Sequence, residues 1–138
     1  MPETKACAAL LLILALASSP LLAQGRPNCK DPQTQTEMNI CAGLDYKAAD
    51  AELNRAYKAA MAGMKDMDSN LPPALKGAEK TLRAAQRAWI PYRDKACAAY
   101  GFMARGGSME SMLVGSCLAD LTRKRTKELK DIAKGLAN

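Results

Sequence analysis

Cysteine is the residue type whose number and spacing in this 138-residue chain most clearly point to chemistry. Cys7 lies in an apolar amino-terminal segment, and Cys29, Cys41, Cys97 and Cys117 follow it. Four cysteines in a short exported chain are typical of two disulfides. The alternative is a metal site with four thiolate ligands, but the spacings lack the paired C-x2-C motifs of structural zinc sites. We therefore expect two disulfides and no metal or other cofactor.

The pairing of these cysteines has three solutions. Joining neighbours along the chain, Cys29 with Cys41 and Cys97 with Cys117, closes two short loops, each worth about 3 kcal/mol in the chain-entropy model. We favour this local pairing. The long-range alternative joins Cys41 to Cys97 and Cys29 to Cys117, and the sequence alone excludes neither it nor the third connectivity.

Few residues or motifs of this sequence are suited to catalysis. The chain has no histidine, which removes the commonest general base at neutral pH. It also lacks a phosphate-binding G-x-x-x-x-G-K-[ST] loop and a G-x-S-x-G nucleophile elbow. Carboxylate pairs such as Glu37 with Asp45 would suit acid–base work, but exposed carboxylates on helices usually form a solvated face. We expect a binding protein, not an enzyme.

The amino-terminal segment has the pattern of a secretory signal. Lys5 precedes an apolar run over residues 6–17, and a small residue, Ala23, follows at the expected cleavage position. The run is shorter than the roughly 20 residues needed to cross a bilayer, and no cysteine stands where a lipoprotein would be lipidated. We predict a cleavable signal peptide over 1–23, a mature domain over 24–138 that is periplasmic or secreted, and no stable membrane anchor.

The mature chain suits one small domain with a helical core. Removing the signal takes away one acid and one base, so the net charge stays at +6, and aromatic residues make up only 4% of the chain. The core must therefore be built from Ala, Leu and Met, which favour helices. Thr34 and Glu37 form a capping box that starts a first helix, which we expect to end near Lys65. Its inward positions recur every three or four residues: Met38, Ala42, Tyr46, Ala49, Leu53, Ala56, Ala60 and Met64.

Two more helices complete the predicted fold. Pro73 opens the second, whose expected inward positions are Leu75, Ala78, Leu82, Ala85, Trp89, Tyr92 and Ala96. A glycine-rich loop over 101–108 follows, and Ser108 or a neighbour would cap a third helix over 109–134. Its expected stripe is Val114, Leu118, Leu121, Arg125, Leu129, Ile132 and Leu136. We predict an all-α, small three-helix up-down-up bundle with both disulfides at one end.

Two arginines lie on or near the inward faces of the predicted helices. Arg93 falls on or beside one face of the second helix with Gln86, Trp89, Ala96 and Cys97, and we interpret Trp89 as a core residue. Arg125 occupies an inward position, where a cation needs an anionic or polar partner. Asp50 and Asn54 on the first helix are the candidates. Alternatively, the Arg125 side chain extends outward so that its guanidinium reaches solvent, and both interpretations stay open.

The motifs together resemble the LprI-like lysozyme-inhibitor domain family over essentially the whole mature chain. They are Cys29, Thr36-Glu37-Met38-Asn39, Cys41-Ala42, Ala49-Asp50, Leu53-Asn54, Tyr57, Ala85-Gln86-Arg87-Ala88-Trp89, Tyr92-Arg93-Asp94, Cys97, Gly107-Ser108, Cys117, Thr122, Arg125 and Leu129. The resemblance implies an exported, disulfide-bonded helical domain of the bacterial envelope, in a family named after a lipoprotein that inhibits lysozyme. The lipobox is absent here, so membrane tethering does not carry over.

Two functions follow as hypotheses. The first is inhibition of a lysozyme-type muramidase, with Phe102, Met103 and Arg105 of the glycine-rich loop as the binding residues. C-type lysozymes are strongly basic, so a chain of charge +6 would be repelled unless its contact face were locally acidic or the muramidase itself were acidic.

The second hypothesis is a periplasmic structural or adaptor module that binds anionic cell-wall polymer or another envelope protein. The basic residues of the third helix favour it: Arg123, Lys124, Arg125, Lys127, Lys130 and Lys134. Interspersed acids make a merely solvated face the stronger interpretation of that run. Export makes nucleic acid an improbable partner.

Overall fold

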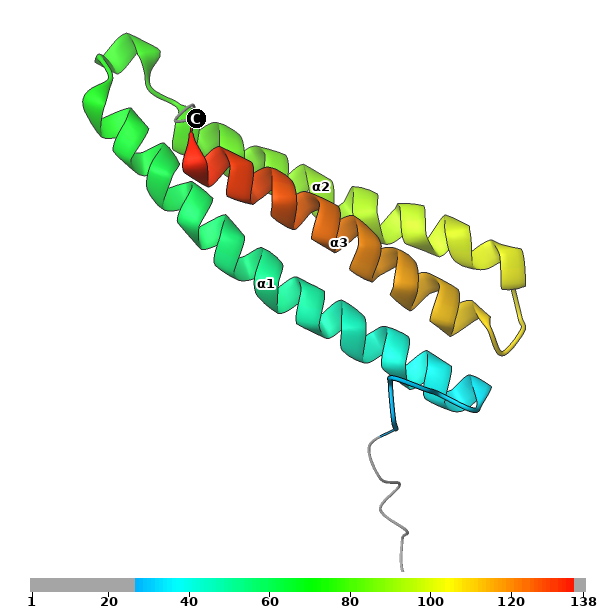
Figure 1. Ribbon diagram of the computed structural model, residues 1–138. Helices are drawn as coiled ribbons and strands as arrows, with labels where there is room; N and C mark the ends of the chain where they lie inside the picture. Colours follow the sequence, from blue (N-terminus) through cyan, green and yellow to red (C-terminus); the bar gives the residue numbers. More distant parts are fainter. Residues whose placement is uncertain (1–26, 136–138) are drawn as a thin grey trace, which may run out of the picture.

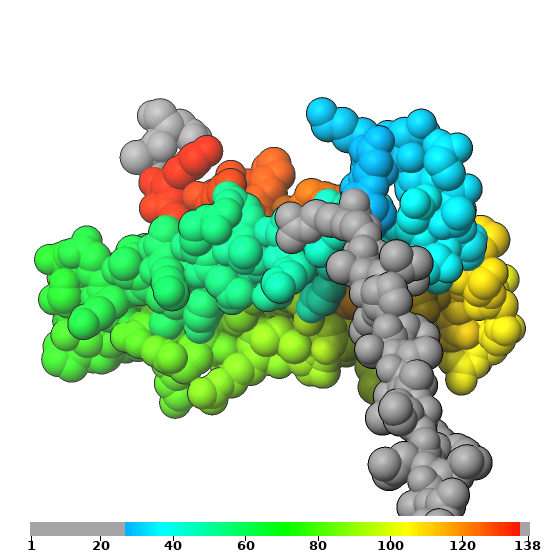
Figure 2. Space-filling view, turned by 90° about the horizontal axis from the view of Figure 1, so that it is seen from below, coloured from blue at the N-terminus to red at the C-terminus, as the bar shows by residue number. Residues whose placement is uncertain are grey.

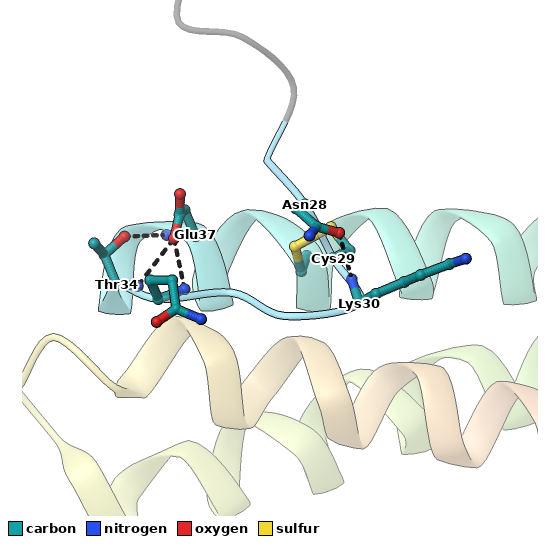
Figure 3. Close-up of a disulfide and its surroundings, with 7 residues drawn as sticks. Asn28, Cys29, Lys30, Thr34 and Glu37 are labelled. Atoms are coloured by element: carbon teal, nitrogen blue, oxygen red, sulfur yellow. Dashed lines mark hydrogen bonds between the residues drawn. A yellow bond between two sulfur atoms is a disulfide. The ribbon is translucent and has the colours of Figure 1, made fainter.

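The capping box at the start of the first helix forms as predicted. The Thr34 hydroxyl accepts a hydrogen bond from the Glu37 N–H (3.2 Å), and the Glu37 carboxylate accepts from the N–H groups of Thr34 (2.9 Å) and Gln33 (2.7 Å) (Figure 3). These bonds satisfy N–H groups that have no partner within a helix. Helix α1 (Gln35–Asn70) starts directly after them.

The computed structural model describes residues 27–135, so the predicted signal peptide over 1–23 and Leu136 lie outside the described residues. After α1 come the 3-10 turn η1 (Pro73–Leu75), helix α2 (Ala78–Gly101), the 3-10 turn η2 (Phe102–Ala104) and helix α3 (Glu110–Lys134). Figure 1 shows α1 and α3 running in the same direction. Helix α2, which lies between them in the sequence, runs in the opposite direction (Figure 1). The predicted all-α, three-helix up-down-up fold is confirmed.

Small residues bring α1 and α3 close together along the most extensive packing in the bundle. Ala42, Ala49, Ala56 and Ala60 are buried on α1, opposite buried small residues of α3 that begin with Gly115. A Cβ atom on Gly115 would lie 3.1 Å from the Cβ of Ala42 and 3.2 Å from its carbonyl carbon. Only glycine permits this approach without displacing α1.

The apolar core occupies the half of the bundle nearer the α1–α2 connection. Its buried residues are Leu53, Ala56, Ala60, Leu82 and Leu129. Trp89 packs against this cluster, which agrees with its interpretation as a core residue. At the opposite end of the bundle the helices meet through alanine, glycine and cysteine instead.

The α1–α2 connection differs from the prediction. Helix α1 does not end near Lys65 but continues to Asn70, and Pro73 opens only the short turn η1. Helix α2 begins after Gly77, where the Asp68 carboxylate of α1 accepts hydrogen bonds from the first backbone N–H groups at 2.9–3.0 Å. The helix start is therefore fixed by a residue about ten positions earlier in the chain.

The buried face of α2 is also rotated from the predicted stripe. Tyr92 is 63% exposed and Ala85 is exposed, whereas the polar residues Gln86 and Arg93 are buried. Each polar residue has a partner on another helix, so burying it is not penalised as an unpaired group would be. Leu75 of η1, expected to face inward, is 66% exposed.

Helix α3 shows the same kind of rotation. Its buried positions are Gly115, Ala119, Thr122, Thr126 and Leu129, while the expected Val114, Leu118 and Leu121 are only half-buried. No side chain caps its start, where Met109 is the N-cap residue, so the predicted role of Ser108 is wrong. The small residues turn inward because α1 approaches this face closely.

Both disulfides have the local pairing that we favoured. Cys29–Cys41 ties a segment preceding α1, here called the strap (Pro27–Thr34), to that helix, and Cys97–Cys117 joins α2 to α3. Figure 2 shows the strap (blue) and the loop between α2 and α3 (yellow) at one end of the molecule and the α1–α2 connection (green) at the other. The predicted placement of both disulfides at one end is confirmed. None of the helices in residues 27–135 is long and apolar enough to span a membrane.

Candidate functional site at the disulfide end

The connection between α2 and α3, here called the tip loop (Phe102–Met109), gathers exposed apolar side chains. Phe102 is 63% exposed, Met103 67% and Met109 45%, and Phe102 is the only phenylalanine of the chain. Together with their neighbours they line a shallow hollow of about 460 Å³. Clustered exposed apolar groups mark surfaces that contact other molecules.

Glu110, the first residue of α3, braces the tip loop with both carboxylate oxygens. Its Oε1 pairs with Arg105 Nη1 at 2.6 Å, and its Oε2 accepts a hydrogen bond from the Gly106 N–H at 2.9 Å. The bond from Gly106, followed by the one from Arg105, holds the pKa of Glu110 below its ordinary value of 4.5. Gly106 has a φ of 76°, a conformation that suits glycine.

Further contacts fix the tip loop to the body of the bundle. Asn39 of α1 donates a hydrogen bond from Nδ2 to the Ser108 carbonyl (3.0 Å). Gly101, at the end of α2, packs so closely on Val114 of α3 that a Cβ atom there would collide with it. Cys97 is fully buried in the disulfide just below. The apolar side chains are therefore displayed on a braced loop.

The predicted binding residues Phe102, Met103 and Arg105 come together in this loop. The Arg105 guanidinium lies over the Phe102 ring, 4.8 Å from its centroid. Sequence reasoning missed the contributions of Met109 and Glu110. An acid in the first turn of a predicted helix, a few residues after a glycine pair, was the available signal for the brace.

A second cluster surrounds the buried Arg93 on α2. Its guanidinium lies over the ring of Tyr46 (5.2 Å to the centroid) and over that of Trp89 (5.1 Å). It pairs with Asp94 at 2.8 Å and with Asp50 of α1 at 3.4 Å. Burial raises the pKa of Tyr46 above its ordinary 10.0, and the Arg93 cation acts in the opposite direction. The cluster joins α2 to α1 through its ion pair and its ring contact, so we interpret it as structural.

Arg125 has partners other than the predicted ones. Asp50 is engaged by Arg93, and Asn54 donates its Nδ2 hydrogen bond to Asp50 at 3.1 Å. Arg125 instead donates from Nε to the buried Gln86 of α2 (3.0 Å) and pairs with Glu128 (2.7 Å). The polar partner is thus on α2, and the carboxylate partner is on the next turn of α3 itself.

The basic run of α3 is largely neutralised. Arg123 binds Asp45 of α1 with two hydrogen bonds of 2.9 and 3.0 Å. Lys127 pairs with Asp131 (2.8 Å) and Lys130 with Glu52 (2.6 Å). Cations that already have carboxylate partners attract a polyanion less strongly. These pairs favour the solvated-face interpretation and weaken the hypothesis of cell-wall polymer binding.

The chain is similar to proteins of one family. The family described as lysozyme inhibitor LprI matches residues 28–129. An uncharacterized protein of Rhizobium meliloti (strain 1021) is 48% identical over 136 residues, covering 96% of this chain and 98% of its own length. A crystal structure of a DUF1311 family protein from Pseudomonas putida KT2440 has the same fold, with a TM-score of 0.61 and 21% identity over 78% of this chain and 99% of that one. The family match over residues 28–129, most of the described chain, shows that the chain belongs to the LprI lysozyme inhibitor family.

Proposed function

We propose that this protein is exported and inhibits a lysozyme-type muramidase by docking its tip loop on the enzyme. The exposure of Phe102 and Met103 on a loop braced by Glu110 carries the proposal. An inhibitor needs no catalytic groups; it needs a projecting surface that keeps its shape when it binds, because ordering a flexible loop would cost binding free energy. The family's inhibitor role supports the same conclusion.

Export supports the proposal from a different direction. The signal-peptide pattern over 1–23 predicts secretion, and the two disulfides suit an oxidising compartment. Muramidases act on the cell wall, so an exported inhibitor would meet its target there. We infer release into the periplasm or the medium after cleavage of the signal.

The net charge of +6 does not prevent this docking at close range. Within the tip loop the Arg105 cation is balanced by Glu110 at 2.6 Å, so the contact face is close to neutral. Long-range repulsion by a basic lysozyme would slow association more than it would raise dissociation. An acidic muramidase would be attracted by the rest of the molecule and should be inhibited at lower concentration.

The test is hydrolysis of cell-wall suspensions by several muramidases, basic and acidic, with and without the oxidised mature protein. We expect at least one enzyme to be slowed at micromolar protein. The double variant Phe102→Ser/Met103→Ser should abolish inhibition. A matched control is Leu75→Ser, because Leu75 is 66% exposed but lies at the other end of the bundle. Unslowed hydrolysis by every enzyme would overturn the proposal.

A further inference from the structure

Arg105 stands out in the tip loop because it is both charged and displayed. Its side chain is 64% exposed, and its guanidinium rests on the Phe102 ring at 4.8 Å. The stacking orients the planar group without burying it. The tip loop therefore presents a guanidinium between exposed apolar side chains.

One of the two bonds by which Glu110 braces the loop does not involve the Arg105 side chain. Glu110 divides its two oxygens: Oε2 holds the backbone of Gly106, and Oε1 pairs with Arg105. If Arg105 turned to another carboxylate, the bond from Gly106 would remain and the loop would keep its shape. Exposed ion pairs of this kind are worth only about 0–1 kcal/mol, so exchanging the partner is not costly.

A muramidase offers a carboxylate at the point where an inhibitor must act. Glycoside hydrolases generally place two carboxyl groups on either side of the bond that they cleave, and one of them is ionised in the resting enzyme. A guanidinium is suited to such a carboxylate because its planar fork donates two parallel hydrogen bonds. The charge of Arg105 therefore complements the catalytic cleft itself, whatever the charge of the enzyme surface.

We infer that Arg105 is the inhibitory residue: it leaves Glu110 and pairs with the ionised catalytic carboxylate of the muramidase, while Phe102 and Met103 bury against the walls of the cleft. This inference rests on the proposed function. It assigns competition with the glycan substrate to one side chain, and it makes Glu110 the resting partner of that side chain.

The experiment compares Arg105→Gln with Arg83→Gln in the oxidised mature protein. Arg83 is a matched control because it is also an exposed arginine paired with a glutamate, Glu79, but lies near the other end of α2. Against a muramidase that the unaltered protein inhibits, we expect Arg105→Gln to raise the inhibition constant at least about tenfold. Arg83→Gln should leave it unchanged.

A binding measurement with an altered enzyme identifies the partner of Arg105. In the altered muramidase, both catalytic carboxylic acids are replaced by amides. It should bind the unaltered protein at least about tenfold more weakly than the unaltered muramidase binds it. The Arg105→Gln variant should bind both enzymes equally tightly. Equal inhibition by Arg105→Gln and the unaltered protein would overturn the inference and leave the proposed function standing. Failure of the unaltered protein to inhibit any muramidase would overturn both.

Discussion

Arg93 contributes to stability through several contacts that act together. Its side chain is only 7% exposed, yet its guanidinium lies over two aromatic rings and pairs with two carboxylates. Asp50, its partner on α1, is held in turn by Asn54. A buried cation with this many partners is stable where it is, and removing it leaves its partners without a counter-charge.

Substitutions of Arg93 should therefore be costly even when the charge is kept. We expect Arg93→Lys to lower the free energy of unfolding by about 1–2 kcal/mol, because lysine loses the planar fork and the stacking. Arg93→Ala should lower it by about 2–4 kcal/mol, since a cavity is added. Arg87→Ala, an exposed change on the same helix, should stay within about 0.5 kcal/mol. Urea unfolding measures all three, and a lysine variant as stable as the unaltered protein would contradict the role of stacking.

At the scale of elements, the start of α2 depends on α1. Asp68 accepts hydrogen bonds from the N–H groups of Gly77, Ala78 and Glu79, which hold the pKa of its carboxyl below the ordinary 3.8. A carboxylate at a helix start also interacts favourably with the helix dipole. The cap closes the α1–α2 connection without a covalent link.

The lowered pKa of Asp68 predicts a pH dependence. A folded-state pKa below the unfolded value means that the ionised carboxylate stabilises the fold at pH values above 3.8, and that this contribution disappears as the pH falls through the folded-state pKa. Asp68→Asn should have a lower melting temperature than the unaltered protein at neutral pH, with the difference shrinking below about pH 4. Asp66→Asn is the control, because the Asp66 carboxylate contacts none of these N–H groups. A constant difference at all pH values would contradict the prediction.

Local patterns in the sequence were enough to predict several elements. The capping box of Thr34 and Glu37 needs only residues three apart. The local cysteine pairing was favoured over the other two because each bridge closes a short loop. Phe102, Met103 and Arg105 were expected in a loop between two helices and lie in that connection, while their role in binding stays a prediction. Each of these features depends on neighbours along the chain.

Contacts between helices could not be predicted in the same way. Alanine occurs on both buried and exposed faces, so the residue pattern of α2 does not fix which face is buried. Ala85 and Tyr92 were predicted to be buried, but the buried residues are Gln86 and Arg93. A polar residue can be buried when another helix supplies its hydrogen-bond or ion-pair partner, and the sequence does not show which residue that partner is. The cap from Asp68 was missed for the same reason, since it comes from across a turn.

At the scale of the whole molecule, the two ends of the bundle are held by different forces. The apolar cluster around Leu53 and Leu129 lies in the half nearer the α1–α2 connection. The end that carries the tip loop has small side chains and both disulfides instead. Covalent bonds thus take the place of a larger core where the tip loop needs support.

Breaking Cys97–Cys117 should therefore loosen one end selectively. In the double variant Cys97→Ala/Cys117→Ala, we expect the free energy of unfolding to fall by about 3 kcal/mol, the value that the chain-entropy model gives for a loop of similar length. Amide hydrogen exchange should accelerate most in the tip loop and the adjoining ends of α2 and α3, and least around Leu53.

The other bridge is the control for that experiment. Cys29→Ala/Cys41→Ala should release the strap and leave exchange in the tip loop almost unchanged, since it is the strap that Cys29 binds to α1. Equal acceleration along all three helices in the Cys97→Ala/Cys117→Ala variant would show that the bundle opens as one unit, contrary to the prediction.

The up-down-up order also decides how the protein presents itself when it is attached to a surface. The end of α3 lies beside the α1–α2 connection, at the opposite end from the tip loop (Figure 1). A biotin placed at Lys134 would orient every immobilised molecule with the tip loop toward the solution, whereas attachment through the strap would crowd it against the support. Kinetic measurements on a sensor chip should therefore use the first geometry.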